Sequence, residues 1–412
     1  GPIGDSIEGI FTRLKESAVT MQWGGGIGCD FSTLRPSGAT AQTSGSIASG
    51  PVSFMRIWDA MCGTLLSTGA RRGAMMATLR CDHPDIEAFV NVKREAGQLR
   101  NFNLSVQVTD EFMRALAANE DWPLLFPREP GDTEGDCVDI RWPGYDVSVP
   151  CRVWRRVPAR ELWRRIVDSA YDSAEPGVLF VDRINRENNL WYREHITSTN
   201  PCGEVPLPPN GACTLGSLNL PTFVRSPFGV RAEVDFAALE GTVATAVRFL
   251  DDIVTLSKYP LPEQRAQAHA TRRIGLGVTG LADALCMLGL GYGSDAGTAA
   301  AALVQERIRD AAYRASIALA TEKGAFPAFE RDAYLAGPFV ARLPADIRDG
   351  IAQHGVRNSH LLAVAPTGTI SLLANNVSSG VEPIFSVESE RKVLDASGER
   401  QTYRVVDYPA AW

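Results

Sequence analysis

The residues best suited to chemistry form one short run, Asn200-Pro201-Cys202-Gly203-Glu204. In an extended backbone, alternate side chains point to one face, so Asn200, Cys202 and Glu204 would lie side by side. Pro201 lacks the N–H that a central strand needs, which favours a loop. An amide, a thiol and a carboxylate at one place suit thiol or redox chemistry assisted by a general base.

A chain reversal follows this run. Residues 208–211 read Pro-Pro-Asn-Gly, which is typical of a tight turn. We therefore expect Cys213 to return near Cys202 and to add a second thiol to the same pocket. The alternative interpretation is that both cysteines are structural and lie buried beside a turn.

Residues 365–371 (APTGTIS) form a second run of interest, directly after the apolar residues 361–364. A strand, a hydroxyl-rich turn and a helix start would present backbone N–H groups and the positive end of a helix dipole to a phosphate. The run has no P-loop lysine, so it is not a Walker A motif. The alternative is a well-capped helix.

The glycines of residues 275–280 (GLGVTG) match the GxGxxG fingerprint of dinucleotide-binding loops. That fingerprint needs a hydrophobic strand before the glycines and a carboxylate about 20 residues later. Here the polar and basic residues 268–273 come first, and they predict a helix end or a loop. We expect these glycines to allow close helix packing, and we do not expect nicotinamide binding.

Composition narrows the class of protein. The 412 residues are 45% hydrophobic and 22% charged, as in globular proteins, and the net charge of −7 disfavours a nucleic-acid partner. No apolar stretch approaches the roughly 20 residues that cross a bilayer, and no signal peptide opens the chain, so we expect a cytoplasmic protein without a membrane partner. The eight cysteines include no CxxC pair and the histidines no HExxH motif, so no metal site is expected.

Apolar spacing predicts the elements that position these runs. Helices are expected at residues 7–22, 53–69, 84–94, 109–118, 159–171, 235–257, 279–288, 295–323 and 331–336. Strands are expected at residues 102–108, 178–181, 213–220 and 361–365. Their alternation indicates an α/β fold. We expect one domain over residues 1–412, with a surface excursion at 120–152.

With these runs in place, the sequence resembles the catalytic chains of ribonucleotide reductases, and more closely the adenosylcobalamin-dependent class II. The resemblance extends over nearly the whole chain. It is carried by residues 200–204, 206–213, 215–220, 24–35, 50–55, 71–89, 175–185 and 365–385. It implies a ten-stranded α/β barrel of the ribonucleotide reductase and glycyl-radical type, with a finger loop inside. We expect this chain to be a piece of a longer protein, truncated at both ends.

The resemblance also implies a role for each residue of the first run. Cys202 would form the thiyl radical that removes the ribose 3′ hydrogen, Glu204 would act as base on the 3′-hydroxyl, and Asn200 would hydrogen-bond the ribose hydroxyls. Cys213 would be half of the cysteine pair that supplies reducing equivalents while the 2′-hydroxyl leaves as water. The substrate phosphates would be bound by Thr367, Gly368, Thr369, Ile370 and Ser371.

Partners follow from the same resemblance: a ribonucleotide substrate, a deoxynucleotide or ATP effector, a thiol reductant such as thioredoxin, adenosylcobalamin as cofactor, and a homodimer as one allowed assembly. Asp5, Gln98 and Arg100, with the loop 40–50, match the effector side. The partner of Cys213 is expected upstream of residue 1, and the tail cysteines that re-reduce the pair are expected downstream of residue 412. Cys29 follows a glycine turn, and we expect it to serve packing.

Two alternatives stay open. Within the family, the chain would be the large subunit of a metal-radical class I enzyme that needs a separate radical-generating protein. Outside catalysis, it would be an inactive nucleotide-binding regulatory protein. Such a regulator has no need of Asn200, Cys202, Glu204 and Cys213, and their presence favours an enzyme.

Overall fold

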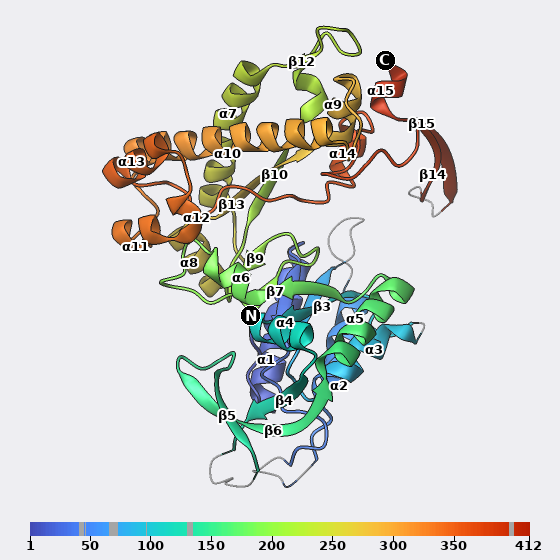
Figure 1. Cartoon of the computed structure of the whole chain (residues 1–412), viewed down its shortest axis with the longest axis vertical. Coiled ribbons are helices and arrows are strands. Elements are labelled where there is room, and N and C mark those ends of the chain that lie inside the picture. Colours follow the sequence, from blue (N-terminus) through green and yellow to red (C-terminus); the bar gives the residue numbers. More distant parts are fainter. Residues whose placement is uncertain (41–44, 46, 66–72, 96, 130–134, 395–398) are drawn as a thin grey trace. The chain divides into compact units, whose positions relative to one another are not determined.

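The structure is a computed structural model, and it describes residues 1–412 except 41–44, 46, 66–72, 96, 130–134 and 395–398. The chain divides into two compact units. The first contains Gly1–Gly211 and Tyr259–Arg265, and the second contains Ala212–Lys258 and Ala266–Trp412. Parallel strands and helices occur in both (Figure 1), so the α/β class expected from the sequence is confirmed.

A four-stranded parallel sheet is the centre of the first unit. Its strands, in spatial order, are β1 (Ile27–Asp30), β2 (Met75–Arg80), β3 (Phe102–Val108) and β7 (Gly177–Phe180). Every residue of β2 is buried, as expected of a parallel strand that is covered on both faces. The helices of this unit are α1 (Ile7–Gln22), α2 (Pro51–Thr64), α3 (Ile86–Asn91), η1 (Val92–Arg94), α4 (Asp110–Ala118), α5 (Ala159–Ser173) and α6 (Val181–Arg186).

Side-chain caps begin two of these helices where the sequence predicts a cap. The Ser6 side chain accepts a hydrogen bond from the Gly9 N–H at 3.0 Å, and α1 starts at the next residue. The Thr109 hydroxyl accepts from the Phe112 N–H at 3.1 Å and starts α4 in the same way.

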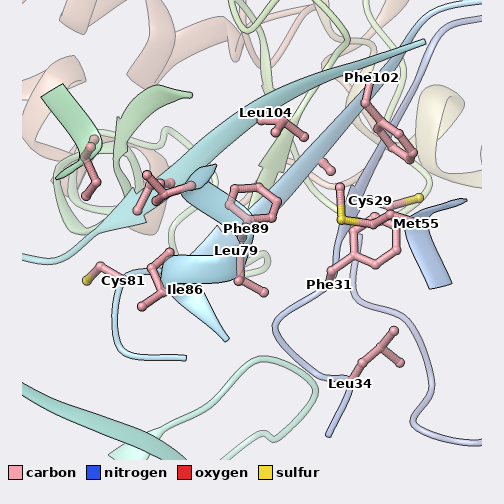
Figure 2. Close-up of a cluster of buried hydrophobic side chains, with 14 of the residues drawn as sticks. Cys29, Phe31, Leu34, Met55, Leu79, Cys81, Ile86, Phe89, Phe102 and Leu104 are labelled. Atoms are coloured by element: carbon pink, nitrogen blue, oxygen red, sulfur yellow. The ribbon is translucent and has the colours of Figure 1, made fainter. Parts of the chain in front are cut away.

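The core of the first unit is built on this sheet. Figure 2 shows Phe31, Phe89, Phe102 and Leu104 among its buried side chains. The Phe31 ring meets the Phe102 ring edge-on, with 6.0 Å between their centroids. Cys29 lies in the same cluster, and burial raises the pKa of its thiol, so the expected packing role is confirmed.

Two smaller antiparallel sheets complete the first unit. One has three strands in the order β4 (Asp121–Pro127), β6 (Ser148–Pro158) and β5 (Cys137–Arg141), and it occupies the segment expected to be a surface excursion. The other is a short hairpin of β8 (Ser198–Thr199) and β9 (Pro206–Leu207). This hairpin carries the run around Cys202.

The second unit pairs β10 (Thr214–Asn219) with β13 (Ile274–Thr279) in parallel. Two long helices, α7 (Phe236–Leu256) and α10 (Asp295–Lys323), pack against each other in this unit. The remaining elements from residue 220 onward are η2 (Leu220–Phe223), β11 (Val224–Arg225), β12 (Glu233–Val234), α8 (Pro262–Thr271), α9 (Leu281–Met287), α11 (Arg331–Ala336), α12 (Pro338–Ala341), α13 (Ala345–His354), α14 (Ile370–Leu373), β14 (Glu388–Leu394), β15 (Arg400–Val406) and α15 (Tyr408–Ala411).

Strand β13 corrects the interpretation of the glycine-rich residues 275–280. Residues 275–279 belong to a fully buried strand, and Gly280 is the left-handed residue that precedes α9. A Cβ built on Gly277 would lie 2.2 Å from the Ala363 backbone oxygen, so glycine lets the segment after Leu361 approach β13. That segment was expected to be a strand at 361–365, but it forms only an isolated bridge between Leu276 and Leu362.

The sheets of the described residues do not close into a barrel by backbone hydrogen bonds. The ten strands implied by the resemblance therefore stay a prediction. None of the described helices is both long enough and apolar enough to span a membrane.

Candidate functional site

The run around Cys202 is a tight turn, which corrects the extended conformation considered from the sequence. The Gly203 N–H donates to the Asn200 carbonyl at 3.1 Å, and Gly203 has a φ of +90°. A side chain at Gly203 would be strained in this conformation, so glycine is what allows the turn. Cys202 lies at its tip, between β8 and β9.

Asn200 closes this turn with its backbone and its side chain. Its N–H donates to the Val205 carbonyl at 3.1 Å, and its Oδ1 accepts from the Val205 N–H at 3.0 Å. Because an N–H must face an oxygen, this bond fixes the orientation of the amide. The Nδ2 group then remains as the donor that Asn200 can offer to a ligand.

The thiol and the carboxylate of the turn differ in their surroundings. Cys202 is exposed, whereas Glu204 is half-buried. The Glu204 Oε2 atom is buried and has no hydrogen-bond partner among the residues that the structure describes. A buried acceptor without a donor is costly unless a ligand supplies one. Glu204 is thus placed to accept a proton or a hydroxyl hydrogen bond.

Three residues that were not expected to contact this turn support it. A Cβ on Gly26 would lie 2.4 Å from Pro201 Cγ, and one on Gly28 would lie 1.8 Å from the Thr199 oxygen. Asn103 donates from Nδ2 to the Pro201 carbonyl at 2.7 Å. Asn103 lies 98 residues before Pro201, so no local pattern connects these two residues.

The chain reversal after the turn is confirmed. The Gly211 N–H donates to the Pro208 carbonyl at 2.9 Å, and Asn210 adopts the left-handed region with a φ of +59°. Cys213 follows at the beginning of the second unit. A Cβ on Gly275 would lie 3.1 Å from its Sγ, so this thiol rests against β13. Its expected proximity to Cys202, which belongs to the first unit, stays a prediction.

The hydroxyl groups of the run 367–371 hold the loop itself. The Thr367 Oγ1 accepts from the Gly380 N–H at 2.7 Å and lies 2.9 Å from the Thr279 Oγ1. Thr367 has a φ of +55°, and these bonds hold it in that conformation. The Ser371 hydroxyl donates to the Gly368 carbonyl at 3.3 Å. Both residues are buried.

Gly368, Thr369 and Ile370 are exposed. Within the described residues, their backbone N–H groups have no hydrogen-bond acceptor. The expected helix start is α14, which has only four residues, so it contributes a small dipole. Three consecutive backbone donors on an exposed loop remain a suitable site for an anion.

A pair of acidic residues lies beside this loop. The Ser378 carbonyl accepts from Thr279 Oγ1 at 3.0 Å, and its N–H donates to Asp283 Oδ2. Asp407 forms a side-chain hydrogen bond with Asp283. Burial, followed by the nearby negative charge of Asp283, raises the pKa of Asp407 to about 7. Asp407 therefore keeps its proton under mildly acidic conditions and can donate it to Asp283.

The residues expected on the effector side lie in two places of the first unit. Asp5 accepts from the Arg35 N–H at 3.2 Å and from Arg35 Nε at 2.9 Å. Half-buried Gln98 and exposed Arg100 lie in the turn between η1 and β3, where Leu99 has a φ of +46°. Of the loop 40–50, residues 41–44 and 46 lie outside the described residues.

No group of three or more His, Cys, Asp or Glu side chains in the described part of the chain is arranged to hold a metal ion. This finding concerns the protein's own side chains only.

Comparison with known proteins identifies the family. A family model described as "Ribonucleotide reductase, barrel domain" matches residues 2–407. The chain belongs to the ribonucleotide reductase barrel-domain family. It is 41% identical over 395 residues to the vitamin B12-dependent ribonucleoside-diphosphate reductase of Mycobacterium tuberculosis strain H37Rv, with 95% of this chain and 50% of the relative covered.

Two further proteins are similar to this chain over most of its length. A protein of the same name from Thermoplasma acidophilum is 39% identical, over 96% of this chain and 46% of its own length. The ribonucleoside-diphosphate reductase large chain of Encephalitozoon cuniculi is 28% identical, over 91% of this chain and 51% of its own length. The chain thus spans about half the length of these relatives.

Proposed function

We propose that this chain provides the catalytic core of an adenosylcobalamin-dependent ribonucleotide reductase, which converts ribonucleoside diphosphates to 2′-deoxyribonucleoside diphosphates for DNA synthesis. The observation that carries the proposal is the Cys202 turn. It presents an exposed thiol, a buried carboxylate oxygen of Glu204 without a donor, and the Nδ2 donor of Asn200. Family membership supports the reaction, and the names of the relatives support the diphosphate substrate.

At the ribose, each group of the turn has one task. The Cys202 sulfur, as a thiyl radical, removes the 3′ hydrogen atom. Glu204 accepts the proton of the 3′-hydroxyl, for which its unpartnered Oε2 is suited. Asn200 donates from Nδ2 to a ribose hydroxyl, because its Oδ1 is already bound to Val205. The turn holds these groups together and so reduces the entropy cost of the reaction.

The electrons come from cysteines. Loss of the 2′-hydroxyl as water and its replacement by hydrogen is a two-electron reduction of the ribose. Cys213 and a second cysteine supply these electrons and two protons, and they become a disulfide. A thiol reductant such as thioredoxin then reduces the disulfide.

The substrate phosphates are bound by the loop 367–371. The N–H groups of Gly368, Thr369 and Ile370 donate to phosphate oxygens, and the buried hydroxyls of Thr367 and Ser371 keep the loop in shape. Backbone donors suit an anion because they carry partial positive charge and need no reorganisation.

The residues present fit a cofactor that delivers a radical to a sulfur atom. The Cys202 thiol is exposed at the tip of its turn, so a bulky cofactor can reach it. Adenosylcobalamin supplies a carbon-centred radical through homolysis of its cobalt–carbon bond. The protein's own task is to hold the sulfur still and to keep water from the radical.

The family match spans both compact units, which supports one catalytic domain over residues 1–412 with a ten-stranded barrel and the Cys202 hairpin as its finger loop. Asp5, Gln98 and Arg100 form part of the side that binds a deoxynucleotide or ATP effector. We place the enzyme in the cytoplasm, and a homodimer is one assembly that this proposal allows.

The test is an anaerobic assay of the natural full-length protein with adenosylcobalamin, a dithiol and a ribonucleoside diphosphate, with the deoxynucleotide as the measured product. Wild type, Cys202→Ala and Cys137→Ala are compared. Cys137 is the matched control, because it is an exposed cysteine of the first unit that lies in β5. We expect product that needs cobalamin and Cys202 but not Cys137.

A fourth variant tests the base. Glu204→Gln keeps the shape but cannot accept the proton, and we expect kcat to fall by about 10²–10⁴-fold. Activity that needs a separate radical-generating subunit in place of cobalamin would move the protein to class I. No product under either condition would support the inactive regulatory alternative.

A further inference from the structure

A row of three residues crosses the parallel sheet beneath the Cys202 turn. Gly28 of β1 is in register with Met76 of β2, and Met76 is in register with Asn103 of β3. Residues in register on adjacent strands share one face of a sheet. All three lie within the first two residues of their strands, so the row runs along the amino ends of the sheet.

Each member of this row contacts the hairpin that carries Cys202. Gly28 leaves room for the hairpin backbone, since a Cβ there would overlap the Thr199 oxygen at 1.8 Å. The Met76 Cε atom is 3.9 Å from the position of a Cβ on Gly203. Asn103 contributes the polar contact, its 2.7 Å hydrogen bond to the Pro201 carbonyl. The row therefore supports the hairpin in three ways. Gly28 leaves space for its backbone, Met76 makes an apolar contact, and Asn103 donates a hydrogen bond.

The Asn103 bond acts on the peptide group next to the reactive residue. The Pro201 carbonyl belongs to the planar peptide that ends at the Cys202 nitrogen. Holding this oxygen fixes the plane of that peptide, and with it the direction in which the Cys202 side chain leaves the backbone. Within the turn itself, the described hydrogen bonds involve Asn200, Gly203 and Val205, on either side of this peptide.

The backbone around Asn103 is held by hydrogen bonds of its neighbours. Two residues before it, the Asn101 N–H and Nδ2 donate to Asp59 of α2, at 2.9 Å to Oδ1 and 3.0 Å to the carbonyl. One residue after it, the Leu104 N–H donates to Glu175 at 3.1 Å. Because the backbone is held on both sides of Asn103, its side-chain amide can hold the Pro201 carbonyl in place. A mobile Asn103 would instead move together with the turn.

We propose that Asn103 is a positioning residue that sets the placement of the Cys202 sulfur through the Pro201 carbonyl. The inference rests on the proposed function of Cys202. A misplacement of about 1 Å at a reacting atom lowers a rate by about 10²-fold. Loss of the Asn103 donor should therefore slow the chemical step and leave substrate binding almost unchanged.

The test compares wild type, Asn103→Asp and Asn103→Gln in the full-length protein. Aspartate keeps the shape but turns an oxygen toward the Pro201 carbonyl, whereas glutamine retains a donor. Asn103 is exposed, so both variants should fold with an unchanged Tm. Hydrogen exchange of residues 200–205 is measured first, with residues 137–141 of β5 as the internal reference.

For Asn103→Asp we expect exchange of the Gly203 and Val205 amides to be about fivefold faster, which corresponds to the loss of one net hydrogen bond. In the cobalamin-dependent assay, kcat should fall by about 10- to 100-fold, and KM for the ribonucleotide should change by less than about threefold. Asn103→Gln should recover part of both effects.

The two readouts separate the possible failures. If hydrogen exchange of residues 200–205 is unchanged in Asn103→Asp, the positioning role is overturned. A rise in KM without a fall in kcat also overturns it, because such a change would mean that Asn103 contacts the substrate. If wild type makes no deoxynucleotide, the proposed function fails, while the exchange measurement still decides whether Asn103 holds the turn.

Discussion

At the scale of single residues, the proposed site separates atoms that hold the structure from atoms that are left for a ligand. The Asn200 Oδ1 accepts from the Val205 N–H, and among the described residues one buried oxygen of Glu204 has no donor. Thr367 uses its hydroxyl within the loop, although its residue type alone favours contact with phosphate. Residue identity predicts the chemistry, and the hydrogen bonds decide which atom performs it.

Asp407 provides a pH test at this scale. Its pKa in the folded state is raised to about 7, above the unfolded value of about 4. Its contribution to stability is therefore present at acidic pH and is lost as the pH rises through about 7. Asp407→Asn removes this loss, so its Tm should exceed that of wild type by more at about pH 8 than at about pH 5.

Asp346→Asn is the control for this measurement. Asp346 is exposed and its hydrogen bond with Arg314 lowers its pKa, so its contribution is lost only below about pH 4. Its Tm difference from wild type should be the same at both pH values. An equal difference for Asp407→Asn would contradict the raised pKa of Asp407.

At the scale of elements, close backbone approach decides where glycine is needed. In β13, a Cβ on Gly277 would lie 2.2 Å from the Ala363 oxygen, a backbone atom that cannot move alone. We expect Gly277→Ala to lower the free energy of unfolding by about 1–3 kcal/mol, as measured by denaturant titration.

The matched control is Gly241→Ala in α7. Gly241 is exposed, and a Cβ there meets no atom within 4 Å. Alanine in this helix should raise stability by about 0.5–1 kcal/mol. If Gly277→Ala behaved in the same way, the packing of the 361–363 segment on β13 would be wrong.

Local pattern was sufficient for elements whose signals are local. Helices at 7–22 and 295–323 and the strand at 102–108 begin and end where apolar spacing and caps place them. Strand β13 was missed because the polar residues before it predicted a helix end or a loop, and the glycines that follow were assigned to helix packing. Arg272 there bonds Asp251, and Arg273 bonds His360, 87 residues away. Such distant partners give no signal in a window of sequence.

The same reason limits what sequence showed of the site. The types and spacing of residues 200–204 indicated the chemistry, but the turn geometry depends on bonds from Gly203 and Val205 back to Asn200. Asn103 and Gly28 are far away in sequence and carry no chemical signature. Only the fold brings them beneath the turn.

At the scale of the whole molecule, the second compact unit has an interior polar network of its own. In the second unit, buried Asp251 accepts from Arg272 Nε at 2.7 Å, Asn358 Nδ2 at 2.9 Å and Arg357 Nε at 3.3 Å. The buried charge of Arg272 and the half-buried charge of Arg357 therefore depend on one carboxylate. Removal of one member of such a network leaves the others buried without compensation.

Asp251→Asn should lower the free energy of unfolding by about 3–5 kcal/mol. Hydrogen exchange should become faster in α7 and α10 and remain unchanged in β1, β2 and β3. The neighbouring Asp252 is the control, because its ion pair with Lys323 is exposed and Asp252→Asn should cost less than about 1 kcal/mol. If hydrogen exchange in Asp251→Asn became equally faster in both units, the effect of this network would not be confined to the second unit, and the prediction would be wrong.

The exposed loop of Gly368, Thr369 and Ile370 has a consequence for how its sequence can vary. Its free donors are main-chain N–H groups, and every amino acid except proline carries one. An alanine scan would leave all three donors in place and overlook the proposed anion site. If the proposal holds, selection can alter these three side chains with little effect on phosphate binding, as long as the buried hydroxyls of Thr367 and Ser371 keep the conformation of the loop.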